Sequence, residues 1–324
     1  MMKYRNIFFS TAAIIFSVLF ALAVSEMILR VKNSTMRNYD IEMWRYAKEL
    51  KKLDTDSALA FDHVPNKVAI LQGVEIRTNE KGLRGGPVPP PGGDERRILF
   101  LGASITLGWG VAEQDTTCEQ VGSMFKSIGE NVVVFNGGVG NYNTVRYVSK
   151  FFKKLTSLKP TDIVVQYFLR DAENLGQDNG NIILRHSMLA VVLWVASQQL
   201  HGSNGETSLL DHYQAVYTDT APGFVVMQDM LRMLAEYSKQ NNIRIYLAMT
   251  PDIHNLVDYK FNFVHQKMET IAKRLGYVYI DLLPALKGIP PEQIYAMRGD
   301  PHPNALGHKI MAETIFATLR TAAH

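Results

Sequence analysis

The sequence has only one cysteine, Cys118, among its 324 residues. A single thiol excludes a disulfide bond within the chain, and it excludes a zinc site built from several cysteines. It also leaves the redox compartment open, because a chain with one cysteine suits an oxidising or a reducing environment. We expect Cys118 to lie on a helix and to take part in its packing.

The net charge of the chain is also small. The 34 lysines and arginines exceed the 31 acidic residues by a net charge of only +3, and they are scattered along the chain. Proteins that bind nucleic acids usually carry a dense basic patch, so we predict no nucleic-acid partner. No pair among the 9 histidines has the spacing of metal ligands, and we expect neither a metal ion nor another cofactor.

One long apolar run is present near the amino terminus. It extends from Ile7 to Leu29, follows Lys3 and Arg5, and is interrupted only by small residues with hydroxyl groups and by Glu26. A membrane-spanning helix needs about 20 apolar residues, whereas the core of a cleaved signal peptide has about 7 to 15. We therefore predict that residues 1–32 form an uncleaved membrane anchor.

Two points about this anchor stay open. Ala21-Leu22-Ala23 also fits a signal-peptidase site, so cleavage is the alternative to permanent anchoring. Arg30, Lys32 and Arg37 follow the apolar run, and basic residues therefore lie on both sides of it. The distribution of positive charge does not fix the orientation of the span.

Short apolar runs farther along the chain predict buried strands, and amphipathic patterns such as Met227–Asn241 and Phe263–Leu275 predict helices between them. The predicted strands are Arg97–Leu101, Val132–Phe135, Ile163–Val165, Ile243–Met249 and Tyr277–Ile280. Strands that alternate with helices indicate a doubly wound, mostly parallel five-stranded sheet inside a three-layer α/β/α sandwich. Reactive loops are then expected at the carboxyl ends of the strands.

The rest of the chain organises around this α/β domain, which we place at residues 97–324. Residues 33–96 are expected to be a membrane-proximal extension and linker, with a turn over Thr78–Gly85 and an extended Pro-rich segment over Pro87–Gly93. Residues 177–222 do not fit the strand–helix repeat and are interpreted as an insertion.

The insertion contains a short apolar segment, Met188–Ala196, which is too short to span a bilayer. It predicts either a helix packed over the sheet or the site, or an interfacial helix that lies near the membrane or docks a membrane partner.

A candidate nucleophile follows the first strand of the predicted sheet. Ser104 lies in the glycine-bounded turn Gly102–Gly110, and Asp300 and His302 stand near the other end of the chain. These are the parts of a Ser-His-Asp site, in which the histidine takes the proton of the serine and the aspartate holds the imidazole. The pattern predicts a serine hydrolase or an acyltransferase, with the Ser104 N–H facing the oxyanion.

Three blocks in this order resemble the SGNH (GDSL-like) hydrolase family, over roughly residues 60–320. They are Gly102–Gly108, in which Ala103 replaces the family's aspartate, then Asn136–Thr144, and finally Asp300–His308. The resemblance implies the flavodoxin-like SGNH hydrolase fold and an enzyme that cleaves ester bonds.

The family has a further block, Gly-x-Asn-Asp, between the second and the last of these, which makes it the third block in chain order. The second and third blocks usually supply two oxyanion donors, and the chain departs from both. In the second block, Asn141 stands at the position of the family's glycine, with Gly140 before it; asparagine tolerates the left-handed backbone that presents the N–H. In the third block, Arg170 replaces the family's asparagine. Either Arg170 or Asn174 then donates to the oxyanion, or Arg170 merely forms an ion pair with Asp171 or Glu173.

Two further histidines have weaker assignments. His254 follows a strand end and is a candidate for substrate binding, although a structural role is the alternative. His308 lies on the predicted closing helix, Ala305–Leu319, and is expected to be buried or to cap a helix.

The anchored layout, the Asp171-Ala172-Glu173 loop and the Asp-x-His-Pro-Asn block most resemble SGNH proteins linked to bacterial exopolysaccharide O-acetylation. This resemblance implies an acylated polysaccharide substrate, a membrane-bound acyltransferase as partner, and a single-pass protein of the bacterial inner membrane with its catalytic domain facing the periplasm. Two alternatives remain, namely a catalytically silent glycan-binding or scaffold protein and a lipase or small-ester esterase.

Overall fold

The computed structural model describes residues 2–33, 39–175, 184, 187–201, 206–297 and 302–321. Contacts between residues divide the chain into two compact units. The first comprises Met1–Lys48 and Asn179–Ser203, and the second comprises Glu49–Asp178 and Asn204–His324. The boundaries predicted from the sequence at residues 32 and 96 stay predictions.

The first unit contains the predicted anchor as one continuous helix, α1 (Met2–Asn33). Its segment Phe8–Lys32 is long and apolar enough to cross a membrane, a property that signal sequences share. Side chains along this segment are exposed, including Phe16 and Leu19. An exposed apolar helix of this length suits a lipid environment. The other helix of this part of the chain, α2, covers Tyr39–Glu49.

The apolar segment of the insertion is also helical, and it forms α7 (Met188–His201) in the first unit. Glu26 of α1 holds its amino terminus: the carboxylate accepts hydrogen bonds from the backbone N–H groups of Met188 and Leu189, both at 2.8 Å, and from the Ser187 hydroxyl at 3.1 Å. A carboxylate there satisfies N–H groups that have no partner within the helix. Both interpretations of this segment, a helix packed over the sheet or the site and an interfacial helix, stay predictions.

The second unit is built on a five-stranded sheet with the order β6-β5-β7-β8-β9, in which all neighbouring strands are parallel. The strands are β5 (Arg96–Gly102), β6 (Val132–Asn136), β7 (Asp162–Tyr167), β8 (Arg244–Met249) and β9 (Val278–Asp281). This order is that of flavodoxin-like doubly wound folds. The predicted sheet is confirmed, because strands buried on both faces appear in the sequence as continuous apolar runs.

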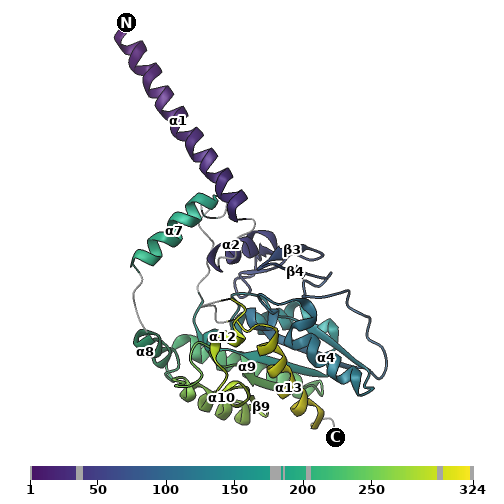
Figure 1. Ribbon diagram of the computed structural model, residues 1–324. Coiled ribbons are helices and arrows are strands. Elements are labelled where there is room, and N and C mark those ends of the chain that lie inside the picture. Colours follow the sequence, from purple (N-terminus) through teal and green to yellow (C-terminus); the bar gives the residue numbers. More distant parts are fainter. Residues whose placement is uncertain are drawn as a thin grey trace. The chain divides into compact units, whose positions relative to one another are not determined.

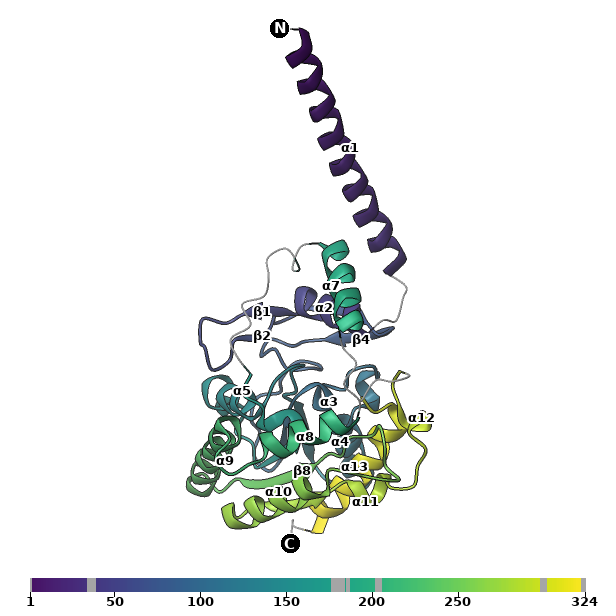
Figure 2. The ribbon, with the colours of Figure 1, turned by 90° about the vertical axis from the view of Figure 1, so that its left-hand side faces the viewer.

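Helices cover both faces of the sheet (Figures 1 and 2). Helices α4 and α13 pack together on one face, and α5, α9 and α10 on the other. The helical segments of this unit are α3 (Ser104–Leu107), η1 (Glu113–Asp115), α4 (Thr117–Ser127), α5 (Thr144–Lys150), η2 (Phe151–Leu155), η3 (Thr156–Leu158), η4 (Leu169–Ala172), α8 (Glu206–Val216), α9 (Pro222–Gln240), α10 (Asn262–Leu275), α11 (Leu283–Leu286), α12 (Pro291–Ile294) and α13 (Ala305–Thr321). The predicted three-layer α/β/α sandwich is therefore confirmed.

Two antiparallel hairpins precede the sheet within the same unit. The first pairs β1 (Lys51–Leu53) with β2 (Phe61–His63), and the second pairs β3 (Val68–Leu71) with β4 (Val74–Arg77). Residues that were expected to form only an extension and linker thus contribute ordered strands to the body that carries the sheet.

Candidate active site

Ser104 lies where β5 ends. The strand stops at Gly102 and α3 begins at Ser104. The turn between them is tight, since a Cβ atom on Gly102 would lie 2.1 Å from the Thr106 Oγ1 and 2.8 Å from the Gln166 carbonyl oxygen. Glycine is required for that approach. Ser104 therefore occupies the first position of a helix, where backbone N–H groups have no acceptor within the helix.

His302 reaches the serine hydroxyl. Its Nε2 lies 2.7 Å from the Ser104 Oγ, and the side chain is only 4% exposed. The loop that carries it is fixed by a 2.8 Å hydrogen bond from the Ala296 N–H to the His302 carbonyl oxygen and by a β-bridge between Tyr295 and Pro303. An imidazole nitrogen at this distance is placed to accept the hydroxyl proton. Two side chains of the predicted triad thus meet.

The third member of the predicted triad, Asp300, lies outside the described residues, which resume at His302. Its role in holding the imidazole stays a prediction.

Arg84 holds the loop that follows the nucleophile, a role that the sequence did not reveal. Its buried guanidinium donates to three backbone carbonyl oxygens, those of Leu107 at 2.7 Å, Gly108 at 2.6 Å and Val111 at 2.7 Å. The planar fork of arginine suits several acceptors at once. The Thr78–Gly85 stretch, which had a surface turn as its simplest interpretation, therefore supplies a structural part of the site.

The loop after β6 runs beside the nucleophile turn. The Val139 N–H donates to the Gly102 carbonyl oxygen at 3.2 Å. Gly138 approaches still more closely, because a Cβ atom on it would lie 2.2 Å from the Leu107 backbone nitrogen. Backbone from the second sequence block therefore lies directly against α3, as a shared site requires.

Asn141 has the left-handed backbone that the family's glycine would provide, with φ at 63°. The carbonyl oxygen of Gly140 accepts a hydrogen bond from Lys51 Nζ at 2.7 Å, and that of Asn141 accepts one from Arg146 Nη1 at 2.9 Å. These contacts fix the two peptide groups that were expected to present the second oxyanion donor. The donor role of Gly140 or Asn141 stays a prediction.

The loop after β7 carries the least expected arrangement. Arg170 is half exposed, and its Nε lies 3.3 Å from Glu173 Oε2, which is the ion pair that the structural interpretation predicts. Asp171 is buried, and burial raises the pKa of its carboxyl well above the usual range. Asn174 is exposed and lines a cavity of about 170 Å³ together with Asn143. The oxyanion role predicted for Arg170 or Asn174 stays a prediction.

Asn143 connects the loop after β6 with the loop after β7, a role that the sequence patterns did not predict. It is buried, its Nδ2 donates to the Glu173 carbonyl oxygen at 2.8 Å, and its Oδ1 accepts the Arg146 N–H at 3.1 Å. The second bond caps α5. An asparagine just before a helix was the signal available in the sequence.

His254 lies near the loop of His302. Its Nδ1 is 2.9 Å from Asp252 Oδ1, and its ring centroid is 5.9 Å from that of Tyr295, the residue that pairs with Pro303. The imidazole is about half exposed. This position is compatible with the predicted contact to substrate, which stays a prediction.

His308 is buried, as predicted. Its Nδ1 lies 2.8 Å from the Thr117 Oγ1 at the start of α4. Burial, with smaller contributions from Arg84 and His302, lowers the pKa of His308 to about 3. A neutral structural imidazole therefore lies close to the site without taking part in it. The described residues contain no group of three or more histidine, cysteine or acidic side chains placed to hold a metal ion.

No protein-family model matches the chain, and no curated protein matches it. Similar solved structures include a catalytic mutant of an acetylxylan esterase from Geobacillus stearothermophilus, 17% identical with a TM-score of 0.47, over 71% of this chain and 95% of that one. A GDSL-like lipase from Bacteroides thetaiotaomicron is 16% identical with a TM-score of 0.41, over 72% and 92%. A psychrotrophic esterase from Pseudoalteromonas is 14% identical with a TM-score of 0.43, over 70% and 98%. Likenesses this distant do not establish an activity, which must be argued from the site itself.

Proposed function

We propose that the chain is a serine esterase or O-acyltransferase that acts on O-acetylated carbohydrate. The observation that carries the chemical part is the 2.7 Å contact between Ser104 Oγ and His302 Nε2. A serine hydroxyl on a glycine-bounded turn, held by a buried imidazole, is the arrangement that activates an alcohol for attack on an ester. The carbohydrate part rests on the resemblance of the sequence blocks alone.

The proposed reaction has two halves. The Ser104 Oγ bonds to the ester carbonyl carbon while its proton passes to His302 Nε2, and the backbone N–H groups of Ser104 and Asn141 hold the oxyanion. The intermediate then expels the sugar alkoxide, which takes the proton from His302 and leaves an acyl group on Ser104. In the second half, water or another sugar hydroxyl gives its proton to His302 and attacks the acyl carbon. The bond from this carbon to the Ser104 Oγ then breaks, and the Oγ takes the proton back from His302. Asp300 would stabilise the imidazolium in both halves.

The acceptor decides between the two activities. Water gives an esterase, and a sugar hydroxyl gives a transferase. A membrane-bound acyltransferase is the proposed partner that supplies acyl groups. We further propose that α1 anchors the protein in the bacterial inner membrane with the second unit facing the periplasm; protease accessibility in spheroplasts tests this orientation.

The first experiment uses the full chain in detergent with a fluorophosphonate probe. We expect the parent to be labelled, and we expect Ser104→Ala and His302→Ala to abolish or strongly slow the labelling. Ser123→Ala, which changes an exposed serine on α4, serves as the control. A folded parent that is never labelled would contradict the proposal and would favour a catalytically silent scaffold.

Substrate class is tested separately. We expect release of acetate from acetylated oligosaccharides, and we expect p-nitrophenyl acetate to be cleaved faster than p-nitrophenyl palmitate. A preference for the long acyl chain would favour a lipase instead. Adding an unacetylated oligosaccharide and following acetyl transfer by mass spectrometry distinguishes the transferase from the esterase.

A further inference from the structure

The hairpin β1–β2 contacts the loop after β6, which forms part of the candidate site. Lys51, the first residue of β1, donates from Nζ to the Gly140 carbonyl oxygen at 2.7 Å. On β2, the Phe61 carbonyl oxygen accepts the Tyr142 hydroxyl at 2.5 Å. Two bonds from neighbouring strands therefore bracket the Gly140–Asn141 peptide group.

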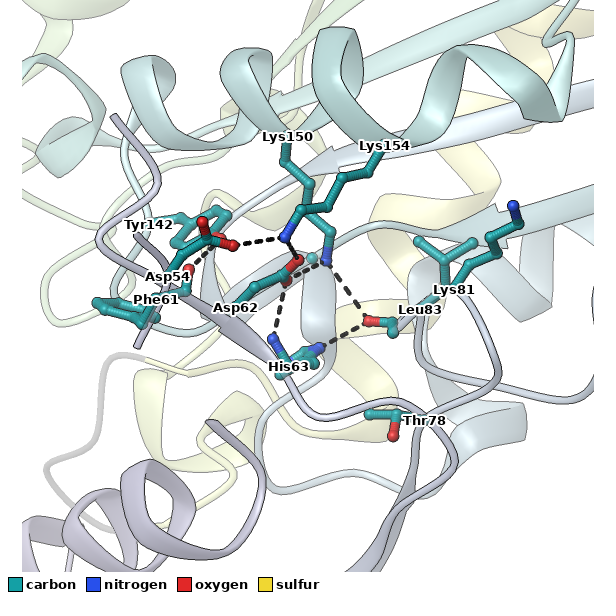
Figure 3. A network of polar contacts seen from close by, with 12 residues as sticks. Asp54, Phe61, Asp62, His63, Thr78, Lys81, Leu83, Tyr142, Lys150 and Lys154 are labelled. Carbon is teal, nitrogen blue, oxygen red and sulfur yellow. Dashed lines mark hydrogen bonds and ion pairs between the residues drawn. The ribbon is translucent and has the colours of Figure 1, made fainter. Parts of the chain in front are cut away.

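Buried ion pairs fix this hairpin to the body of the unit (Figure 3). Asp62 of β2 pairs with the fully buried Lys150 at 2.8 Å and with Lys154 at 2.8 Å, and Lys154 also reaches Asp54 at 2.7 Å. The next residue, His63, bonds through Nδ1 to a backbone carbonyl oxygen at 2.9 Å. Figure 3 shows these side chains converging between the hairpin and the helical segments that carry the two lysines. The hairpin is thus a rigid support.

The Nζ atom of Lys51 is itself held in place. It lies 4.0 Å from the centroid of the Phe61 ring, and the Arg146 guanidinium lies 5.0 Å from the same centroid. The face of the aromatic ring attracts the guanidinium cation and packs against the Lys51 Nζ. Arg146 also donates to the Asn141 carbonyl oxygen at 2.9 Å. One aromatic ring therefore organises the two donors that fix successive carbonyl groups.

The direction of the Asn141 N–H follows from peptide geometry. In a trans peptide the C=O and the N–H point to opposite sides, and the chain has no cis bond among its described residues. With the Gly140 carbonyl oxygen turned toward Lys51, the Asn141 N–H points away from Lys51. No described residue accepts a hydrogen bond from this N–H. Burial, together with the nearby Arg146 guanidinium, lowers the pKa of Lys51 well below its usual range, and its Nζ donates to the Gly140 carbonyl oxygen whether or not it carries the charge.

We propose that Lys51 is a positioning residue for the oxyanion site: it fixes the Gly140–Asn141 peptide group so that the Asn141 N–H meets the developing oxyanion. This inference rests on the proposed function. It assigns to the hairpin before the sheet an indirect part in the chemistry, because Lys51 positions a donor that belongs to the loop packed against α3.

The test compares Lys51→Met and Lys51→Arg with the parent, using p-nitrophenyl acetate and the full chain in detergent. Methionine keeps the apolar contact with Phe61 but removes the donor. We expect kcat to fall about 10- to 100-fold with KM changed less than about twofold, since a misaimed donor costs somewhat less than the loss of one. Lys51→Arg is expected to restore most of kcat. The control is Lys52→Met, an exposed lysine on the same strand.

Two further readouts separate positioning from general damage. The inhibition constant of methylboronic acid, whose serine adduct mimics the tetrahedral intermediate, should rise by the same factor as kcat falls. The amide proton resonance of Asn141, observed after selective labelling of asparagine with nitrogen-15, should move in Lys51→Met and stay in place in Lys52→Met. If Lys51→Met does not fold, Lys51→Gln replaces it in the same comparison.

The outcomes are distinct. An unchanged kcat in folded Lys51→Met, an equal fall in Lys52→Met, or an effect on KM alone would overturn the role of Lys51 while leaving the esterase intact. Hydrolysis by the parent that survives Ser104→Ala would overturn the proposed function itself, whatever Lys51→Met does.

Discussion

Ser104 Oγ and His302 Nε2 lie 2.7 Å apart although 198 positions separate the two residues in the chain. The sheet makes this contact, because β5 delivers the serine at its carboxyl end and α13 follows directly after the loop with the histidine. Each residue on its own would be an ordinary turn or loop residue. Their hydrogen bond is what makes this edge of the sheet a candidate for acyl transfer.

Removing either partner of this contact should cost nearly the whole activity. We expect Ser104→Ala and His302→Ala each to lower kcat/KM for p-nitrophenyl acetate by at least about 100- to 10,000-fold, the usual contribution of a positioned base. Because the two act as one unit, the double variant should be no slower than the slower single variant. Effects that multiply in the double variant would show that the residues act independently.

Arg84→Met should weaken the nucleophile loop. The substitution leaves carbonyl oxygens of Leu107, Gly108 and Val111 without this donor, and each buried unsatisfied group costs about 1 to 3 kcal/mol. We expect the free energy of unfolding in urea to fall by about 3 kcal/mol and kcat to fall with it. Arg77→Met, which removes an exposed ion pair with Glu113, should cost less than about 1 kcal/mol. Equal losses in the two variants would contradict the assigned role of Arg84.

Gly138→Ala tests the close approach to α3 of the loop after β6, which contains Gly138. The new methyl group would meet the Leu107 nitrogen at 2.2 Å, so the two loops must separate. We expect the free energy of unfolding to fall by about 1 to 3 kcal/mol and the rate of fluorophosphonate labelling to drop. Gly93→Ala has open space around it and should change neither quantity measurably. Normal labelling of Gly138→Ala would mean that this approach is not needed.

Acid should destabilise the protein by protonating Asp62, whose ion pairs hold the β1–β2 hairpin. Burial alone would raise the pKa of this carboxyl, but Lys150 and Lys154 lower it from 3.8 to about 2. Since the folded pKa is below the unfolded value, the stabilisation is complete above about pH 4 and is lost as pH falls toward 2, a change of about 2 kcal/mol. Urea unfolding between pH 6 and 2 should therefore show a steeper decline for the parent than for Asp62→Asn. Parallel declines would refute this account.

The Asp62→Asn variant should also be less stable at neutral pH. It leaves the fully buried ammonium of Lys150 without its carboxylate partner, and breaking a buried pair in this way typically costs about 3 to 5 kcal/mol. Asp258→Asn, which removes an exposed pair with Lys260, is the matched control. A similar small loss in both variants would mean that Asp62 contributes no more than a surface carboxylate.

The sheet was predictable from sequence because parallel strands buried on both faces must be apolar throughout. Each predicted run, such as Ile243–Met249, coincides with an observed strand to within two residues at either end. The contact between Ser104 and His302 was predictable for a different reason. A serine on a glycine-bounded turn after a strand, with an Asp-x-His pair far along the chain, is the set of residue types that this chemistry requires.

The supports of the site were not predictable in this way. Arg84 and Lys51 donate to backbone carbonyl groups of distant loops. Because every residue has such a carbonyl group, no pattern in the sequence marks which one accepts the hydrogen bond. Arg170 illustrates the converse. Its replacement of an expected asparagine suggested a role in the chemistry, yet a neighbouring glutamate three residues away offers its guanidinium a simpler local partner.

The carboxylate of Glu26 gives α1 a role besides that of the predicted anchor. Because it holds the first turn of α7, a shortened protein that begins after α1 would keep an apolar helix while losing the group that fixes its start. Such a protein would present Leu193 and Trp194 to water on an unsupported segment and would tend to self-associate. A soluble form of this protein therefore requires deletion of α7 together with α1, so that both apolar helices are removed in the same variant.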